Sequence, residues 1–340
     1  MEHIEGKKFE VSDDGRAIRL DVFLSSRAGV TRSQVQKWIK RGAVFLNGAA
    51  PKKFGVMLVS GDMVSVLPEK IPTERKEQFD IHEDEIMESV KIIAQSENYL
   101  LIDKPSGLVS HPGLHILKKE DITQTVSVSS WILRHWPELW SVGEYPNRPG
   151  MVHRLDKETS GLMLIAKHQA MFDHLKKQFK GRRVEKYYFA LIHGRILEEH
   201  GILDFDVSLG KNGKMVSLPK CGPLTLDKVS SAQEGKKAKT EFWVKERFVN
   251  HTFVEVRTHT GRTHQIRVHF FAFNHPLAGD PLYYHKKTKK DVRCGSLFLQ
   301  AYRLCFDDLN GERLSFEIPL EPRFRHILDQ LPKLRPSLPS

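Results

Sequence analysis

The chain has 340 residues, of which 40% are hydrophobic and 28% charged, which is typical of a globular protein with room for two domains. No apolar stretch approaches the roughly 20 residues that span a bilayer. The N-terminal stretch MEHIEGKKFEVSDDG also lacks the apolar core of a signal peptide, so we expect a cytoplasmic protein. Widely spaced cysteines outside any CxxC arrangement indicate reduced thiols and neither a disulfide framework nor a zinc site. They are Cys221, Cys294 and Cys305.

Basic side chains exceed acidic ones by 11, and the excess is unevenly distributed. Residues 16–70 carry a net charge of +7 and residues 91–340 carry +12, whereas residues 1–15 carry −3 and residues 71–90 carry −5. Two basic blocks joined by an acidic connector favour two surfaces for a polyanion. Basic proteins that bind no nucleic acid also exist, so charge alone does not decide the function.

Residues 16–70 are predicted to form a small module of helices and strands. Leu20, Phe23 and Leu24 fall at i, i+3 and i+4, which predicts one apolar helix face. A second helix is expected to start at Thr31, with basic side chains opposite its apolar face. The expected strands and their first turn are Ala43–Leu46, Asn47-Gly48, Val56–Val59 and Val64–Val66.

For a lone basic helix, a solvated face would be the simplest explanation. Here the segments RLDVFL, TRSQVQKWIKRGAVFLNG and GDMVSV together resemble the S-four-type RNA-binding domain, a small α/β module. Contacts with RNA phosphates provide affinity and position more than sequence choice. By this resemblance, the residues expected to make such contacts are Arg27, Arg32, Lys37, Lys40 and Arg41.

Composition also suggests the domain boundaries. Residues 1–15 are expected to form a polar tail, and the acidic residues 71–90, which lack helical or strand periodicity, a linker. Residues 91–328 then form the second domain. Residues 329–340, which end in RPSLPS, are expected to be a C-terminal tail.

The second domain is predicted to be rich in strands. Its expected strands before and after the central region are Tyr99–Ile102, the segment VEKYYFALIHG, Glu241–Arg247, Phe253–Arg257, Leu297–Phe306 and Leu314–Pro319. Its expected helices are Asp121–His135, Gln169–Lys180 and Thr263–Phe271. Residues 206–240, rich in Gly, Lys and Ser, are expected to form a mobile basic loop. This order favours an α+β domain with a mixed, mainly antiparallel sheet.

The central stretch is MVHRLDKETSGLMLIAK, residues 151–167. A polar cluster leads through a Thr159-Ser160-Gly161 turn into the apolar run Leu162–Ala166, which predicts a buried strand. Asp156 would therefore lie on a tight loop that enters a core strand, a position that holds a reactive group still. From residue types alone, a loop salt bridge between Arg154 and Asp156 is the more common explanation.

The motif HRLDKETSG followed by an aliphatic strand resembles the signature of the RluA-type pseudouridine synthases. The K-x-Y-x-A-L pattern in VEKYYFALIHG and the segment THTGRTHQIRVHFFAFNHPLAGDPLY match further motifs of that family in the expected order. The resemblance covers about residues 16 to 320. It implies a catalytic cleft in which Asp156 is the catalytic aspartate, Tyr188 rather than Tyr187 the active-site tyrosine, and Arg267 the partner of Asp156.

The family's reaction converts uridine in RNA to pseudouridine, which requires a carboxylate near the anomeric carbon. That carboxylate acts either as a nucleophile or as a base that yields a glycal, and the sequence leaves both routes open. The resemblance implies that Arg154 fills the space left by an extruded base. Arg262 and His264 are expected to bind phosphate or to support their loop. No cofactor or metal is expected, and the expected state is a monomer.

Large-subunit ribosomal RNA is the preferred substrate, with transfer RNA as the alternative, and residues 114–123 form a longer connection than the family usually has. Two other classes of function remain open. A glycosidic-bond hydrolase would generally need two opposed carboxylates, yet Glu158 lies only two residues from Asp156. A non-catalytic RNA-binding or ribosome-assembly factor would not require the intact motifs.

Overall fold

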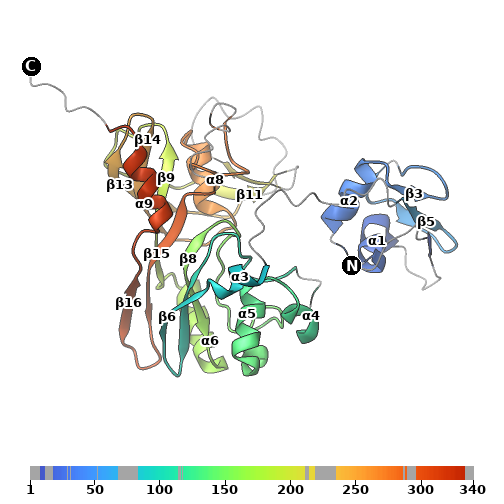
Figure 1. Cartoon of the computed structure of the whole chain (residues 1–340), viewed down its shortest axis with the longest axis horizontal. Coiled ribbons are helices and arrows are strands. Elements are labelled where there is room, and N and C mark those ends of the chain that lie inside the picture. Colours follow the sequence, from blue (N-terminus) through green and yellow to red (C-terminus); the bar gives the residue numbers. More distant parts are fainter. Residues whose placement is uncertain are drawn as a thin grey trace, which may run out of the picture. The chain divides into compact units, whose positions relative to one another are not determined.

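The computed structural model describes the following residues: 8–11, 18–28, 30, 32–51, 53–67, 83–113, 116, 118–210, 214–218, 235–285, 288 and 296–333. The chain divides into two compact units, residues 1–80 and residues 81–340 (Figure 1), and each is described by itself. In the described part of the chain, every helix is too short or too polar to span a membrane.

The first unit combines two helices with short antiparallel strands (Figure 1). Its elements are β1 (Lys8–Glu10), β2 (Ile18–Arg19), α1 (Leu20–Ala28), α2 (Arg32–Lys40), β3 (Val44–Leu46), β4 (Met57–Leu58) and β5 (Met63–Val66). The predicted helix faces are buried against the sheet, and Asn47 and Gly48 both have positive φ, as the turn requires.

Residues 8–11 differ from the predicted N-terminal tail. The strand β1 pairs antiparallel with β5, and Val11 is buried in the small core at 6% exposure. A three-residue strand is too short for periodicity to reveal, and its position depends on the partner strand rather than on its own sequence. The predicted tail over residues 1–15 is therefore wrong for this part.

The second unit is built on one nine-stranded mixed sheet in the order β10-β13-β14-β9-β15-β8-β7-β6, with β16 paired to β15. All of its strand pairs are antiparallel except β15 with β8. The strands are β6 (Lys91–Gln95), β7 (Tyr99–Lys104), β8 (Ser160–Ala166), β9 (Glu185–His193), β10 (His200–Leu203), β13 (Thr240–Arg247), β14 (His251–Thr258), β15 (Leu299–Asp307) and β16 (Arg313–Glu317). The predicted mixed, mainly antiparallel α+β sheet is confirmed.

Helices pack against this sheet (Figure 1), and a separate hairpin packs against one of them. The helix α6 packs on β8 and β15, whereas α8 packs on β13 and on the hairpin formed by β11 and β12. The bounds are α3 (Glu83–Glu88), α4 (Lys119–Thr123), α5 (Val128–His135), η2 (Pro137–Ser141), α6 (Gln169–Lys180), β11 (Asp206–Leu209), β12 (Met215–Leu218), α8 (Gln265–Ala272) and α9 (Pro322–Gln330).

The strand β8 lies inside the sheet, between β7 and β15, and every residue in it is buried. Its second residue, Gly161, has a φ of +112° and lies against the backbone of Ala301 in β15. A Cβ atom at Gly161 would lie 2.2 Å from the carbonyl oxygen of Ala301, so no other residue fits there without moving the strands. The predicted buried strand is confirmed, and it holds the preceding loop against the core. The turn lies at Lys157 and Glu158 rather than at the predicted Thr159-Ser160-Gly161, because Ser160 and Gly161 already pair within the sheet.

The predicted helix Asp121–His135 is two helices, α4 and α5. The chain leaves the helical conformation before Ser127, whose side chain accepts a hydrogen bond from the Ser130 backbone amide as the N-cap of α5. Serine and threonine side chains compete for backbone groups in this way and favour helix ends. The buried face of α5, with Val128, Trp131 and Ile132, agrees with the prediction.

Three segments predicted to be irregular contain regular structure. The helix α3 lies within the predicted linker 71–90, and Met87 and Val90 are buried in the main core. The hairpin of β11 and β12 occupies part of the predicted loop 206–240. The helix α9 continues to Gln330, and Leu331 is buried, so the predicted C-terminal tail at 329 begins too early. Residues 71–82, 219–234, 334–340 and parts of 114–123 lie outside the described residues.

Candidate active site

Asp156 lies on the loop that leads into β8, and side chains from the segment after β7 hold this loop in place. The Ser110 hydroxyl donates to the Leu155 carbonyl oxygen at 2.7 Å and accepts from the Leu155 amide at 3.2 Å. The Ser106 hydroxyl donates to the carbonyl oxygen of Glu158 at 2.7 Å. Both flanks of Asp156 are therefore tied to one neighbouring segment, so the carboxylate is held on a preformed loop.

Lys104, the last residue of β7, lies beneath the same loop and is fully buried. Its ammonium donates to the carbonyl oxygens of Pro105 and Leu108 at 2.8 Å each, and to that of Lys157 at 3.2 Å. Burial lowers the pKa of Lys104 to about 7, and the nearby carboxylate of Asp156 opposes this shift. The sequence showed a Lys-Pro-Ser-Gly turn here but not that its lysine supports the Asp156 loop.

Arg267 on α8 is the ion-pair partner of Asp156, as the sequence motif implied. Its Nη1 atom lies 3.4 Å from the Asp156 Oδ2 atom and 3.6 Å from the Glu158 Oε2 atom. The guanidinium is 0% exposed and forms two hydrogen bonds of 2.8 Å with the Asp280 carboxylate. Burial alone would lower the pKa of Arg267, but Asp280 raises it above its ordinary value. Arg267 therefore provides a permanent positive charge beside Asp156.

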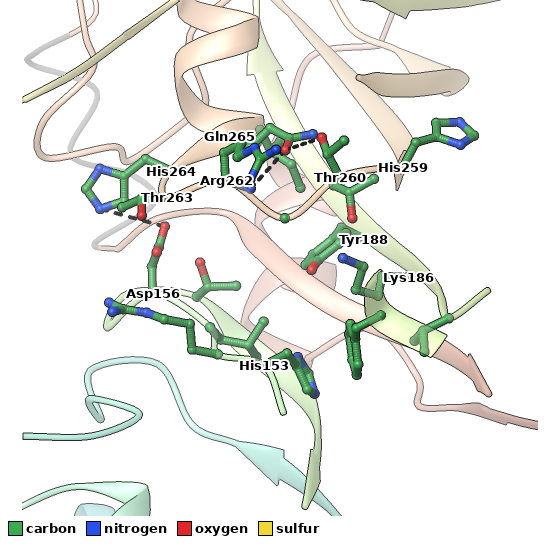
Figure 2. Close-up of a pocket in the computed structure, with 18 of the residues that line it drawn as sticks. His153, Asp156, Lys186, Tyr188, His259, Thr260, Arg262, Thr263, His264 and Gln265 are labelled. Carbon is green, nitrogen blue, oxygen red and sulfur yellow. Dashed lines mark hydrogen bonds and ion pairs between the residues drawn. The ribbon is translucent and has the colours of Figure 1, made fainter. Parts of the chain in front are cut away.

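His264 contacts Asp156 from the other side (Figure 2). Its Nε2 atom lies 3.9 Å from the Asp156 Oδ2 atom, and its Nδ1 atom lies 2.8 Å from the Tyr283 hydroxyl. His264 has a φ of 54°, a left-handed conformation that turns the chain into α8. Burial lowers the pKa of His264, although Asp156 acts against this. Tyr283 and Asp280 were missed as site residues, although both stand in the quoted AGDPLY segment.

Tyr188 faces the same cavity from the sheet, whereas its neighbour Tyr187 does not line it. Alternate residues of a strand point to opposite faces, and Tyr187 packs under the Arg303 guanidinium, 3.8 Å from its ring centroid. Burial raises the pKa of Tyr188 to about 12, and the negative charge of Asp156 acts in the same direction. Its hydroxyl is therefore neutral at physiological pH.

The cavity between these elements has a volume of about 600 Å³ (Figure 2). Asp156 is the only acidic residue among those that line it in the described chain. The basic and aromatic residues lining it include Arg154, Arg262, His264, Arg267, Lys186 and Tyr188. The structure thus brings together all six residues that the family motifs indicated in this domain, from three separate parts of the chain.

Arg154 does not form the loop salt bridge with Asp156 that composition alone would favour. Its side chain is exposed, and its Nη1 atom lies 3.1 Å from the His111 Nε2 atom. Arg262 is also exposed; its Nε atom donates to the Lys237 carbonyl oxygen at 3.2 Å. Both guanidinium groups therefore lie at the cavity wall with donors left for a ligand.

The basic residues predicted in the first unit have different environments. Arg32 forms an ion pair of 3.0 Å with the fully buried Asp21, which Arg19 also contacts at 3.0 Å. Burial would raise the pKa of Asp21, but these two arginines and Gln36 lower it well below its ordinary value. Arg32 thus stabilises the module itself. Arg27, Lys40 and Arg41 are exposed, as is Arg32 despite its ion pair, and the side chain of Lys37 lies outside the described part.

Comparison with known proteins gives consistent matches over the whole chain. Residues 98–272 match the model of the RNA pseudouridylate synthase family, and residues 18–64 match the S4 domain. An uncharacterized RNA pseudouridine synthase of Aquifex aeolicus is 34% identical over 96% of this chain and 98% of its own length. A ribosomal large subunit pseudouridine synthase D of Neisseria meningitidis serogroup B is 34% identical over 92% of this chain and 78% of its length.

A solved structure, that of human RNA pseudouridylate synthase domain containing 1, has the same fold. Its TM-score is 0.54 at 21% identity, over 73% of this chain and 98% of that one. The family model covers more than half of the chain, and the relatives align over nearly all of it. The chain therefore belongs to the RNA pseudouridylate synthase family of isomerases and carries an S4 RNA-binding domain.

Proposed function

We propose that the protein isomerises specific uridines of large-subunit ribosomal RNA to pseudouridine, with Asp156 acting at the ribose. The observation that carries this proposal is the single carboxylate of the cavity, held beside a buried arginine. Relatives from Neisseria and Nitrosomonas are named ribosomal large subunit pseudouridine synthases, which supports the choice of RNA. Their RNA target also supports a cytoplasmic location.

The reaction breaks the bond between the ribose C1′ and the uracil N1 and forms a bond between C1′ and C5. The C5 carbon loses its proton, and N1, which carries no proton while it is bonded to the ribose, gains one, so the product is an isomer of uridine. Asp156 starts this sequence either by attacking C1′ or by removing the C2′ proton. Both routes require an ionised carboxylate, and the Arg267 guanidinium lies 3.4 Å from the Asp156 carboxylate as its ion-pair partner. The geometry therefore serves either route.

Tyr188 and Arg154 are assigned to the base. The Tyr188 ring provides an aromatic wall for uracil, and its hydroxyl, with a pKa of about 12, acts as a neutral hydrogen-bonding group. Arg154 is exposed at the cavity, where a planar guanidinium can stack in the helix from which the uridine is extruded. Arg262 is assigned to RNA phosphate, and His264 to support of the Asp156 loop.

A glycosidic-bond hydrolase fits the site less well. Such enzymes use two carboxylates on opposite sides of the bond. Here the second nearby acid, Glu158, shares the Arg267 guanidinium with Asp156 and does not line the cavity in the described chain. A lone carboxylate suits an isomerase, in which the detached base is kept and rejoined. Release of free uracil from RNA would instead support the hydrolase.

The function can be tested by mapping pseudouridine in total RNA from cells that lack the protein. We expect a small set of sites to be lost, restored by the wild type and by the surface variant Asp173→Asn, and not restored by Asp156→Asn. The last variant keeps the shape of the side chain and removes its charge. Full restoration by Asp156→Asn would refute the role of Asp156. If the pseudouridines that disappear lie in transfer RNA, the ribosomal target would be refuted, but the assignment as a pseudouridine synthase would still hold.

A further inference from the structure

A second positive charge, which is partly buried, lines the cavity, and the chemistry described above does not use it. Lys186 is two residues before Tyr188 on β9, so both side chains project from the same face of the strand (Figure 2). Lys186 lines the cavity. Within the described chain it forms no ion pair with a carboxylate, and burial alone lowers its pKa to about 8. The ammonium is thus partly dehydrated and lacks a counter-ion.

Among the described residues, no carboxylate forms an ion pair with Lys186. Its Nζ atom lies 5.7 Å from the centroid of the Phe179 ring, which in turn stacks on His153. Burial lowers the pKa of His153 to about 3, so this ring is neutral. Gly261 also lies close to Lys186, because a Cβ atom at Gly261 would be 3.5 Å from the Lys186 Nζ atom. The Phe179 ring, the His153 ring behind it and the backbone of Gly261 therefore form the surroundings of the Lys186 ammonium.

Two exposed cations line the same wall of the cavity. Lys180 ends α6, and Arg182 follows in the turn before β9. Neither forms an ion pair in the described structure, whereas the neighbouring Lys176 is paired with Glu144. Positive charge therefore extends from the cavity interior, at Lys186, to its exposed edge.

We propose that Lys186 binds a backbone phosphate of the RNA next to the extruded uridine, with Lys180 and Arg182 continuing that phosphate track toward solvent. This inference rests on the proposed function for the identity of the ligand. A phosphate carries the full negative charge that a dehydrated ammonium needs, whereas a neutral uracil carbonyl would leave that charge uncompensated. The exposed cations favour the same choice, because an RNA backbone continues out of the cavity and a base does not.

The test measures binding of an oligouridylate probe to the full chain carrying Asp156→Asn, which stops turnover, over a range of KCl concentrations. Adding Lys186→Met should weaken binding and reduce the slope of log K against log salt by about 0.7, the value for one phosphate of a single strand. Lys186→Arg should retain the slope. The matched control is Lys167→Met, which removes a half-buried lysine bonded to the Ser96 carbonyl oxygen.

Thermal melting separates a binding role from a structural one. Removing an unpaired buried cation should leave the melting temperature of Lys186→Met equal to that of its parent or raise it. A lowered melting temperature, or an unchanged salt slope, would overturn the proposal. If Lys186→Met in a chain with Asp156 intact lost pseudouridine formation while the salt slope stayed unchanged, Lys186 would be assigned to the base instead. Because the binding assay needs no turnover, its outcome does not depend on whether pseudouridine is the product.

Discussion

At the scale of single residues, the site is organised by one guanidinium shared among three carboxylates. Arg267 binds Asp280 through two short hydrogen bonds and lies farther from Asp156 and Glu158. Asp280 therefore fixes the arginine, and Asp156 remains free to approach a ligand. The Asp280 carboxylate also accepts hydrogen bonds from the Leu282 and Tyr283 amides, so its own position is fixed by the backbone.

The substitution Asp280→Asn should therefore be costly although it conserves size. It leaves Arg267 buried with weaker partners, and we expect a loss of about 3 kcal/mol in unfolding free energy, the lower end for breaking a buried pair. Pseudouridine formation should also fall, because the guanidinium is no longer held toward Asp156. Urea denaturation and single-turnover assays measure both effects. Asp173→Asn is the control, and equal values for the two variants would contradict the role of Asp280.

The family motifs indicated Asp156, Tyr188 and Arg267, whereas residue types alone favoured a loop salt bridge for Asp156. The same information did not indicate Lys104 or Asp280. Their importance arises from contacts across the fold, such as the three carbonyl oxygens around Lys104, which no local pattern of the sequence displays.

At the scale of elements, the Asp156 loop and β8 behave as one unit. Besides the Gly161 contact with β15, His153 connects the start of the loop to the strand. Its Nε2 atom accepts a hydrogen bond of 2.9 Å from the Leu164 amide, which requires that nitrogen to be unprotonated. The loop therefore depends on a neutral imidazole.

The stability of this connection should depend on pH. Burial lowers the pKa of His153 to about 3, compared with about 6.5 in an unfolded chain. The unfolded state therefore binds more protons between these values, and the contribution of His153 is present above pH 6.5 and lost as pH falls toward 3. Between pH 7 and pH 4.5, wild type should lose about 2–3 kcal/mol more than His153→Gln, whose amide oxygen can still accept the bond.

Urea denaturation of both proteins at the two pH values measures this difference. The change in unfolding free energy of His153→Gln between the two pH values is subtracted from that of wild type. This removes the contributions of the other titrating groups, which both proteins share. An identical pH dependence in the two proteins would show that His153 is not the group whose protonation weakens the loop.

Periodicity predicted the sheet strands and α6 well, because their buried faces repeat at regular intervals. Periodicity failed for elements whose structure depends on contacts with distant parts of the chain. The short edge strand β1 is defined by its pairing with β5, and α3 is held by Met87, which is buried in the main core. The break between α4 and α5 required knowledge that Ser127 acts as an N-cap rather than as a helical residue.

At the scale of the whole molecule, we expect the two units to make two kinds of contact with RNA. The larger unit contains the cavity, and the small one presents exposed cations near the end of α2. Arg32 forms an ion pair with Asp21, so Lys40 and Arg41 are the better candidates for binding RNA. These contacts would add affinity without altering the chemistry.

The double variant Lys40→Ala/Arg41→Ala should weaken RNA binding and reduce the salt slope by about 1 for each charge removed. At saturating RNA, the rate of pseudouridine formation should equal that of wild type, because the cavity is untouched. Lys245→Ala, in the larger unit and paired with Glu255, is the control. A reduced rate at saturation would instead tie the small unit to the chemical step.

Three carboxylates, those of Asp156, Glu158 and Asp280, lie around a single arginine, and this should affect how an RNA strand lies in the cavity. We expect that corner to repel the phosphates of an RNA strand and the wall bearing Lys186 to attract them. An uncharged part of a nucleotide, such as its ribose, would then be the part that approaches Asp156.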